Sequence, residues 1–196
     1  MNSIILTKTY GELPLNKAEI FRYAGAKELD GSLSALLEDC LKEAEGLIDY
    51  RVCYRELTVT VKGGVCDFGI FKTESQKLAK NLSGCQKAVL FAATLGVGID
   101  RLITKYSTLS PAKALIFQAI GAERIEALCD TFCQDLILEG GLTLKPRFSP
   151  GYGDLSLDTQ KEIFKLLDCS RKIGLTLNGS LLMSPTKSVT AFVGVI

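Results

Sequence analysis

The chain has 196 residues, of which 47% are hydrophobic and 23% charged, and its formal net charge is +1. This balance is typical of a globular domain, and the scattered basic residues give no reason to expect nucleic acid, a membrane surface or a polyacidic partner. The longest mainly apolar run, residues 88–99, is shorter than the roughly 20 residues of a membrane span, and no signal peptide is evident. We therefore expect a cytoplasmic protein.

The first half of the chain alternates helical and extended patterns. Asn16 is suited to cap one helix and Asp30 the next, whose apolar residues recur at helical spacing. After residue 50 the period changes to that of a strand, and Gly63-Gly64 predicts a hairpin turn. The expected elements are a strand at 3–9, helices at 16–23 and 32–50, strands at 52–62 and 65–71, and a short helix at 76–82.

The second half contains the longest predicted helix. Ser110-Pro111 is a strong start signal for it, and Gly140-Gly141 is a stop signal. Asp158 is suited to cap a later helix that Gly174 ends. The expected elements are a buried strand at 87–94, helices at 99–106, 111–139 and 158–172, a loop over 142–157, and strands at 175–177, 181–183 and 188–195.

This order mixes helices and strands without the strict alternation of a parallel sheet. An α+β fold with a twisted, mainly antiparallel sheet flanked by helices fits it best. We expect residues 1–196 to form a single unit. Within it we predict a helical and hairpin lobe over residues 1–84 and a C-terminal lobe with a ligand loop over residues 85–196.

The chain has no histidine and seven cysteines. Catalysis by Ser-His-Asp or Cys-His groups, and zinc sites that use imidazole, are therefore excluded. Cys129 and Cys133 stand one helical turn apart and would suit a shared metal, but no second cysteine pair accompanies them. The favoured interpretation is that the cysteines are small buried apolar residues, with no metal and no disulfide framework.

The glycine turn after the strand at 87–94 is the first candidate site. A strand, Gly96-x-Gly98 and a helix are typical of dinucleotide binding, but the third glycine of that pattern is absent. Asp100 would also repel a phosphate. A tight turn is the favoured interpretation.

The second candidate is an acidic helix face. Glu123, Glu126 and Asp130 lie three and four residues apart and so share one side of the long predicted helix. A solvated surface is the common interpretation of such a face. The functional interpretation is a carboxylate that receives an ammonium group.

The third candidate is the loop Arg147-Phe148-Ser149-Pro150-Gly151-Tyr152-Gly153-Asp154. The arginine offers a fork that grips a carboxylate, and the tyrosine offers a stacking face. The glycines allow the backbone to approach a ligand and read an adenine edge. A well-packed loop without a ligand is the alternative, and the residues alone leave both open.

Several segments together resemble the activation (reactivation) domain of cobalamin-dependent methionine synthase. Arg147-x-x-Pro150-Gly151-Tyr152 and the following helix resemble a loop of that family in which an arginine, three residues and Gly-Tyr-Pro lead into a helix. Residues 174–177 and 183–189 are similar to its Gly-x-x-Leu-Thr and Met-x-Pro-x-x-Ser-Val segments. Residues 126–130 resemble its Glu-Ala-Phe-Ala-Glu. The likeness covers residues 143–192 and is weaker upstream.

The resemblance implies a fold and a ligand, S-adenosylmethionine. The fold would be a twisted antiparallel sheet with flanking helices. The arginine would grip the methionine carboxylate, the acidic residue would lie near the methionine amino group, and the last residue of the loop would read adenine through its backbone. The implied binding residues are Glu126, Arg147, Gly151, Tyr152, Gly153 and Asp154.

The resemblance also implies a function, the reductive methylation of cob(II)alamin. The cobalamin would be carried by a partner, a methionine synthase that lacks its own activation domain, and a flavodoxin-like protein would supply the electron. No side chain of this chain need act as an acid or base. An adaptor or docking protein for a corrinoid methyltransferase that has lost S-adenosylmethionine binding is the alternative. A small-molecule binder of another class is a third interpretation.

The sequence departs from the family pattern at three positions. Gly153 stands where the family has proline, Leu155 where it has cysteine, and Asp158 where it has histidine. The chain also ends soon after the strand at 188–195, where the family continues. We therefore expect a divergent, stand-alone form of the domain.

Overall fold

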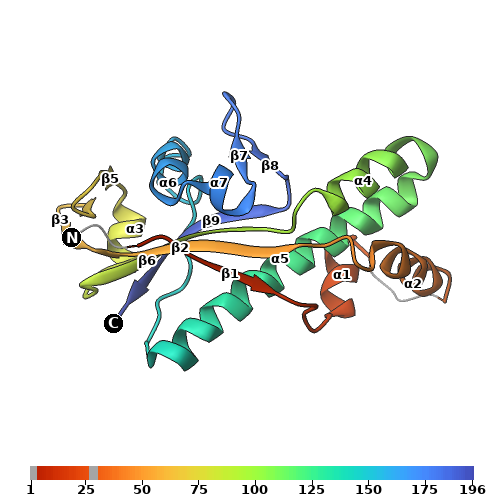
Figure 1. The fold of residues 1–196 in the computed structure, drawn as a ribbon, viewed down its shortest axis with the longest axis horizontal. Coiled ribbons are helices and arrows are strands. Elements are labelled where there is room, and N and C mark those ends of the chain that lie inside the picture. Colours follow the sequence, from red (N-terminus) through yellow and green to blue (C-terminus); the bar gives the residue numbers. More distant parts are fainter. Residues whose placement is uncertain (1–3, 27–30) are drawn as a thin grey trace.

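The computed structural model describes residues 4–26 and 31–196 (Figure 1). Its helices are α1 (Lys17–Tyr23), α2 (Gly31–Ala44), α3 (Gln76–Asn81), α4 (Gly98–Leu109), α5 (Pro111–Gly140), α6 (Thr159–Leu167) and α7 (Cys169–Ile173). Its strands are β1 (Leu6–Tyr10), β2 (Tyr50–Thr58), β3 (Thr60–Lys62), β4 (Val65–Asp67), β5 (Lys72–Glu74), β6 (Lys87–Thr94), β7 (Thr176–Leu177), β8 (Met183–Ser184) and β9 (Ser188–Val195). Within the described ranges, no helix combines the length and apolar character needed to cross a bilayer.

Four strands form the central sheet, in the order β1-β2-β6-β9, and each neighbouring pair is antiparallel. Phe91 of β6 lies opposite Tyr54 of β2 on one side and opposite Ala191 of β9 on the other. The α+β fold with a mainly antiparallel sheet, which the sequence predicts, is confirmed. Strands of both halves of the chain contribute to this one sheet. The division into lobes at residues 84 and 85 stays a prediction.

Helices cover both faces of the central sheet. Because side chains alternate along a strand, Phe91 and Ala93 join a core with α1, α2, α4 and α5, whereas Leu90 and Ala92 join a second core with α3, α6 and α7. In Figure 1, α5 runs as a long diagonal whose C-terminal part lies below the strands, and α6 and α7 lie above them. The interior of β6, AVLFAA, is continuously apolar because both of its faces are buried.

The long helix α5 begins and ends where its sequence signals place it. The Ser110 hydroxyl accepts a hydrogen bond from the Lys113 N–H, and Gly141 ends the helix in the left-handed conformation with φ 60°. The far end of α5 is tied to the sheet because Asp135 accepts hydrogen bonds from Lys8 (3.1 Å) and Tyr10 (2.8 Å) on β1. The helix is therefore held at both ends.

Two predicted helices differ from the structure in length. The helix expected at 32–50 ends at Ala44, because the chain turns at Gly46, with φ 71°, and enters β2 at Tyr50. The helix expected at 158–172 breaks at Asp168, which adopts φ 49° and separates α6 from α7. The Asp158 side chain makes no capping hydrogen bond. The predicted cap at Asp30 lies outside the described residues.

In the structure, a third strand follows the two strands of the predicted hairpin. The returning strand expected at 65–71 ends at Asp67, because a turn at Gly69, with φ 78°, reverses the chain. The chain then adds β5 to make the small sheet β3-β4-β5. This sheet leads directly into α3, which Ser75 caps by accepting a hydrogen bond from the Leu78 N–H (2.9 Å).

The glycine turn between β6 and α4 is a packing feature. Gly96 adopts φ 71°, in the left-handed region. A Cβ atom at Gly98 would lie 1.8 Å from the Leu47 carbonyl oxygen, so only glycine allows this approach of two backbone segments. The tight-turn interpretation of Gly96-x-Gly98 accounts for both glycines.

Residues 143–148 cover the outer edge of β9. The Lys145 N–H donates to the Gly194 carbonyl (2.9 Å), and Phe148 and Phe192 exchange two backbone hydrogen bonds of 2.9 Å each. This stretch of loop therefore behaves as a short extension of the sheet. It fixes the main chain on both sides of Arg147.

Candidate functional site

Arg147 lies between the sheet edge and α5. Its guanidinium donates one hydrogen bond to Glu126 (2.7 Å) and another to Asp130 (2.5 Å). Burial opposes the positive charge, but the hydrogen bond to Asp130 and the neighbouring negative charges outweigh burial and raise the pKa of Arg147 above its ordinary value. The guanidinium is thus a fixed cation held by two carboxylates.

The two carboxylates belong to one face of α5. Glu126, Asp130, Cys133 and Ile137 lie four, three and four residues apart, so they form a stripe along the helix. We call these four residues the α5 strip. Arg147 contacts its first two members, and the sequence-predicted pair Glu126 and Arg147 is brought together there.

Two hollows lie along the α5 strip. The acidic hollow has a volume of about 310 Å³ and is lined by Pro14, Asn16, Glu19, Tyr23, Glu123, Glu126, Ala127 and Asp130. The apolar hollow has a volume of about 400 Å³ and is lined by Cys133, Ile137, Leu144, Lys145, Pro146 and Arg147. Each volume is at the lower end of the range for small-molecule sites. The ion pairs of Arg147 with Glu126 and Asp130 link residues of both hollows.

Glu123 differs from its two acidic neighbours on α5. The carboxylate is buried and accepts two hydrogen bonds from Arg124, at 2.5 and 2.6 Å, and one from the Asn16 N–H at 3.1 Å. It therefore stabilises the chain around residue 16 against α5. The solvated acidic face suggested by the helical spacing consists of Glu126 and Asp130 alone.

Asp154 is bound to the start of α3. Its carboxylate accepts hydrogen bonds from the Ser75 hydroxyl, from the Gln76 N–H (2.8 Å) and from the Lys77 N–H (3.2 Å). A carboxylate at a helix N-terminus satisfies N–H groups that have no partner within the helix. The side chain thus has a structural partner on a segment 77 to 79 residues away in the sequence.

Replacing Asp154 with asparagine is expected to lower stability at neutral pH but not in acid. The hydrogen bond from Ser75 and those from the backbone hold the pKa of the Asp154 carboxyl below its ordinary value. The stabilisation is therefore complete above the unfolded-state pKa of about 3.9, and it is lost as the pH falls through the lower folded-state pKa. Urea titrations of both proteins from neutral pH to about pH 2.5 would measure this change. A stability difference that stays constant across this range would contradict it.

Tyr152 and its two glycine neighbours form an exposed turn. The Tyr152 side chain is 67% exposed, and its ring meets the Phe148 ring edge-on at 5.3 Å. Gly151 and Gly153 adopt φ angles of 84° and 64°, which a residue with a side chain rarely tolerates. The turn therefore presents an aromatic face and main-chain groups at the surface.

The cysteines agree with their interpretation as small apolar residues. Six of the seven are buried, and Cys133, in the apolar hollow, is half-buried. Burial raises the pKa of the Cys133 thiol, although Arg147 opposes this shift. In the part of the chain that the structure describes, no group of three or more potential metal ligands occurs.

Several residues around the site belong to no motif that could have predicted them. Pro14 and Tyr23 line the acidic hollow although they precede Glu126 by about a hundred positions, and no motif links them to α5. The capping signal at Asn16 is confirmed, since its side chain accepts a hydrogen bond from the Glu19 N–H (3.2 Å). That signal fixes the helix but does not predict which surface the helix borders.

Comparisons with known proteins support the fold alone. No protein-family model matches the chain, and no curated protein matches it in sequence. Among solved structures, the crystal structure of the MetH reactivation domain bound to AdoHcy is similar, with a TM-score of 0.70. The match covers 98% of this chain and 78% of that chain, at 14% sequence identity. The two proteins share an architecture over almost the whole length of this chain.

Proposed function

We propose that this chain binds S-adenosylmethionine at the α5 strip and the loop from Arg147 to Asp154, and that it serves to reactivate a corrinoid-dependent methionine synthase. The observation that carries the proposal is the cluster of Arg147, Glu126 and Asp130 between two hollows. The fold adds support, because a reactivation domain of the same architecture binds AdoHcy, the demethylated form of the proposed ligand.

The charges of the cluster complement those of the ligand. Two carboxylates and one guanidinium leave an excess of one negative charge, whereas S-adenosylmethionine carries a sulfonium, an ammonium and only one carboxylate. Glu126 and Asp130 are suited to receive the ammonium group. Arg147 is suited to hold the carboxylate through a charge-assisted hydrogen bond.

The ligand carboxylate has to share Arg147 with a protein carboxylate. Both terminal nitrogens of the guanidinium donate to α5, one to Glu126 and one to Asp130. The Asp130 side chain is 73% exposed and that of Glu126 is 46% exposed. Asp130 is the partner to be displaced, because an ion pair so exposed to water contributes little stability.

We assign the adenosine end of the ligand to the turn of residues 151–154. The exposed ring of Tyr152 offers a stacking surface, and the left-handed Gly151 and Gly153 leave the main chain accessible on either side of it. Asp154 contributes through its backbone, since its carboxylate is engaged by α3.

The partner we propose is a corrinoid-binding methionine synthase without its own activation domain, in the cytoplasm. S-adenosylmethionine would supply the methyl group for the cobalamin of this partner, and a flavodoxin-like protein would supply the electron. The residues of this chain bind and orient the ligand and limit its contact with water. We propose no acid or base catalyst among them.

Isothermal titration calorimetry with S-adenosylmethionine tests the ligand. Saturable binding is expected for the natural chain, and Arg147→Met is expected to weaken it about 10- to 100-fold, as for a lost hydrogen bond between charged groups. Arg171→Met is the matched control, because Arg171 is 85% exposed and pairs with Asp168 three residues away. Its affinity should equal that of the natural chain.

Two results would count against this assignment. No heat of binding at millimolar ligand would exclude the natural chain as an S-adenosylmethionine protein. Binding that is equally strong in the natural chain and in Arg147→Met would leave the ligand but reject its proposed position at Arg147.

A non-catalytic adaptor for a corrinoid methyltransferase is the second candidate function. Two of the residues expected to contact the ligand already use their side chains in hydrogen bonds within the protein, which favours this function. Arg147 donates to α5, and Asp154 accepts from the start of α3. Sedimentation of the chain with a corrinoid-loaded methionine synthase distinguishes the two. An adaptor would associate equally with and without S-adenosylmethionine, whereas a reactivation protein would associate more strongly with it.

A further inference from the structure

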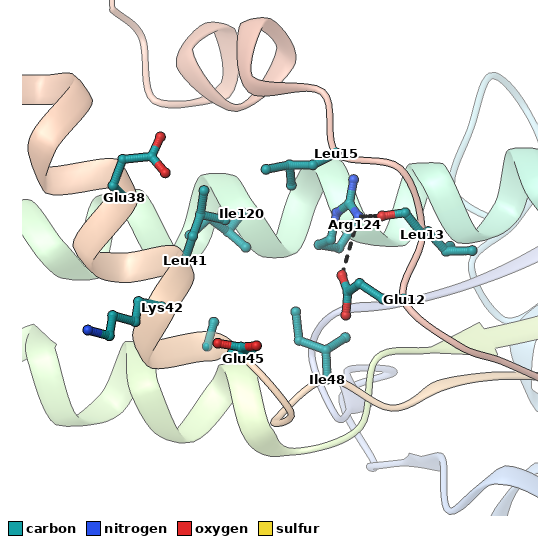
Figure 2. Close-up of a pocket in the computed structure, with 11 residues that line it drawn as sticks. Glu12, Leu13, Leu15, Glu38, Leu41, Lys42, Glu45, Ile48, Ile120 and Arg124 are labelled. Carbon is teal, nitrogen blue, oxygen red and sulfur yellow. Dashed lines mark hydrogen bonds and ion pairs between the residues drawn. The ribbon is translucent and has the colours of Figure 1, made fainter.

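A third hollow, which we call the α2 cavity, lies between α2, α5 and residues 12–15 (Figure 2). Its volume is about 550 Å³, within the range of small-molecule sites. It shares no lining residue with the acidic hollow, because the segment of residues 12–16 separates them. Leu13 faces the α2 cavity and Pro14 the acidic hollow. The α2 cavity is therefore a place distinct from the proposed S-adenosylmethionine site.

Six of the eleven residues that line the α2 cavity are apolar. Leu41 and Ile48 contribute from α2 and the segment after it, Ile120 from α5, and Leu15 from the segment opposite. Figure 2 shows these side chains around a common space. Leu15 keeps 37% of its surface exposed. Covering such surface with an apolar group is favourable, so the walls suit a ligand with a hydrocarbon or aromatic body.

The positive charges near this cavity are already used or directed elsewhere. Arg124 is buried and donates to the carbonyls of Leu13 (2.8 Å) and Pro14 (2.6 Å) as well as to Glu123. The guanidinium therefore shapes the wall but has little charge left to offer a ligand. The amine of Lys42 points away from Arg124 in Figure 2.

Two of the three carboxylates that line the cavity already have partners. Glu12 accepts a hydrogen bond from the Tyr50 hydroxyl (2.9 Å) and pairs with Arg124 (3.7 Å), and Glu38 pairs with Lys17 (2.5 Å). Glu45 has no hydrogen-bond or ion-pair partner among residues 4–26 and 31–196, and it lies beside Ile48 at the rim (Figure 2). A cavity with an apolar wall and an unpaired carboxylate at its rim complements an organic cation.

We propose that the α2 cavity binds a small organic cation, a molecule with an apolar body and a protonated amine. The body lies against Leu15, Leu41, Ile48 and Ile120, and the amine lies at the rim beside Glu45. The site is formed in advance, because Arg124 holds the opposite wall through its bonds to Leu13 and Pro14. Binding of a ligand in the α2 cavity requires no residue of the α5 strip.

Three probes with the same apolar body and different charges test this proposal. They are 4-phenylbutylamine, 4-phenylbutan-1-ol and 5-phenylpentanoate, each titrated into the whole chain and followed by amide chemical shifts. The amine is expected to saturate at millimolar concentration or below, about fivefold more tightly than the alcohol, with the carboxylate weakest. The shifts should gather at Leu15, Leu41, Ile48 and Ile120.

Two charge reversals separate the local carboxylate from the net charge of the protein. Glu45→Lys changes the rim of the α2 cavity, whereas Glu162→Lys makes the same change on α6, on the other face of the sheet. Glu45→Lys should weaken binding of the amine about fivefold or more and leave the alcohol unchanged. Glu162→Lys should change neither, and Arg147→Met should also leave binding of the amine unchanged.

Each of three results would overturn the proposal. Equal affinity for all three probes would make the cavity a hydrophobic hollow without charge selection. Shifts that gather at the α5 strip would place the cation in the other site. No saturation by any probe at about 10 mM would mean that no ligand of this class binds.

Discussion

Replacing Arg124 with methionine is expected to lower the free energy of unfolding by about 3–5 kcal/mol. The Arg124 side chain is 1% exposed and satisfies both oxygens of Glu123, whose side chain is 5% exposed. It also binds the carbonyls of Leu13 and Pro14. Methionine has a similar length but no donor, so it would leave a buried carboxylate and two carbonyls without these partners. Urea titration monitored by circular dichroism measures the change.

A second substitution identifies the cause of this loss. In Arg124→Met combined with Glu123→Gln, the buried position carries no charge, so part of the lost stability should return. Arg22→Met is the matched surface control, because Arg22 is 61% exposed and pairs with Glu19 within α1. Its cost should be small, because an ion pair so exposed to water contributes little stability. If Arg124→Met cost no more than Arg22→Met, Arg124 would not be what fixes the segment of residues 12–16.

Replacing Gly98 with alanine is expected to cost about 3 kcal/mol, the upper part of the range for overpacking. The new methyl group would lie 1.8 Å from the oxygen and 2.8 Å from the carbon of the Leu47 carbonyl. Backbone atoms cannot rotate away as a side chain can. The opposing segment is also fixed nearby, because the Asp49 N–H donates to the Leu95 carbonyl (2.9 Å). Urea titration again gives the measurement.

Gly11→Ala is the matched control for this steric effect. Nothing lies within 4 Å of the Cβ position at Gly11, and its φ lies outside the left-handed region. The substitution should therefore change stability by less than about 1 kcal/mol, in either direction. Equal losses for Gly11→Ala and Gly98→Ala would indicate that flexibility, and not close packing, explains the glycine at 98.

Local sequence signals predicted those elements whose ends are chemically marked. Pro111 and Gly141 bound α5, and the continuous apolar run of β6 identified a strand buried on both faces. The break between α6 and α7 had no such signal. Asp168 adopts a left-handed conformation, which aspartate tolerates better than most residues, but nothing in its neighbours requires it. Tertiary packing decides that break.

Site residues were predictable from the sequence only where they belong to one short segment, and not where they depend on contacts between distant segments. The loop from Arg147 to Asp154 stands out through its residue types, and the resemblance pointed to Glu126 as a partner. Helical spacing placed Glu123 with Glu126, but the segment of residues 12–16 covers Glu123 and leaves Glu126 exposed. The bond between Asp154 and Ser75 joins residues 79 positions apart, and no local pattern reports it.

The segment of residues 143–148 also protects the protein from self-association. Without its hydrogen bonds to Phe192 and Gly194, β9 would present unpaired backbone groups along an apolar strand, a surface on which another chain can add a strand. The same few residues carry Arg147 and shield this edge. Any change that loosens them therefore risks aggregation together with the loss of the site, and such variants should be judged by their solubility before their ligand binding is interpreted.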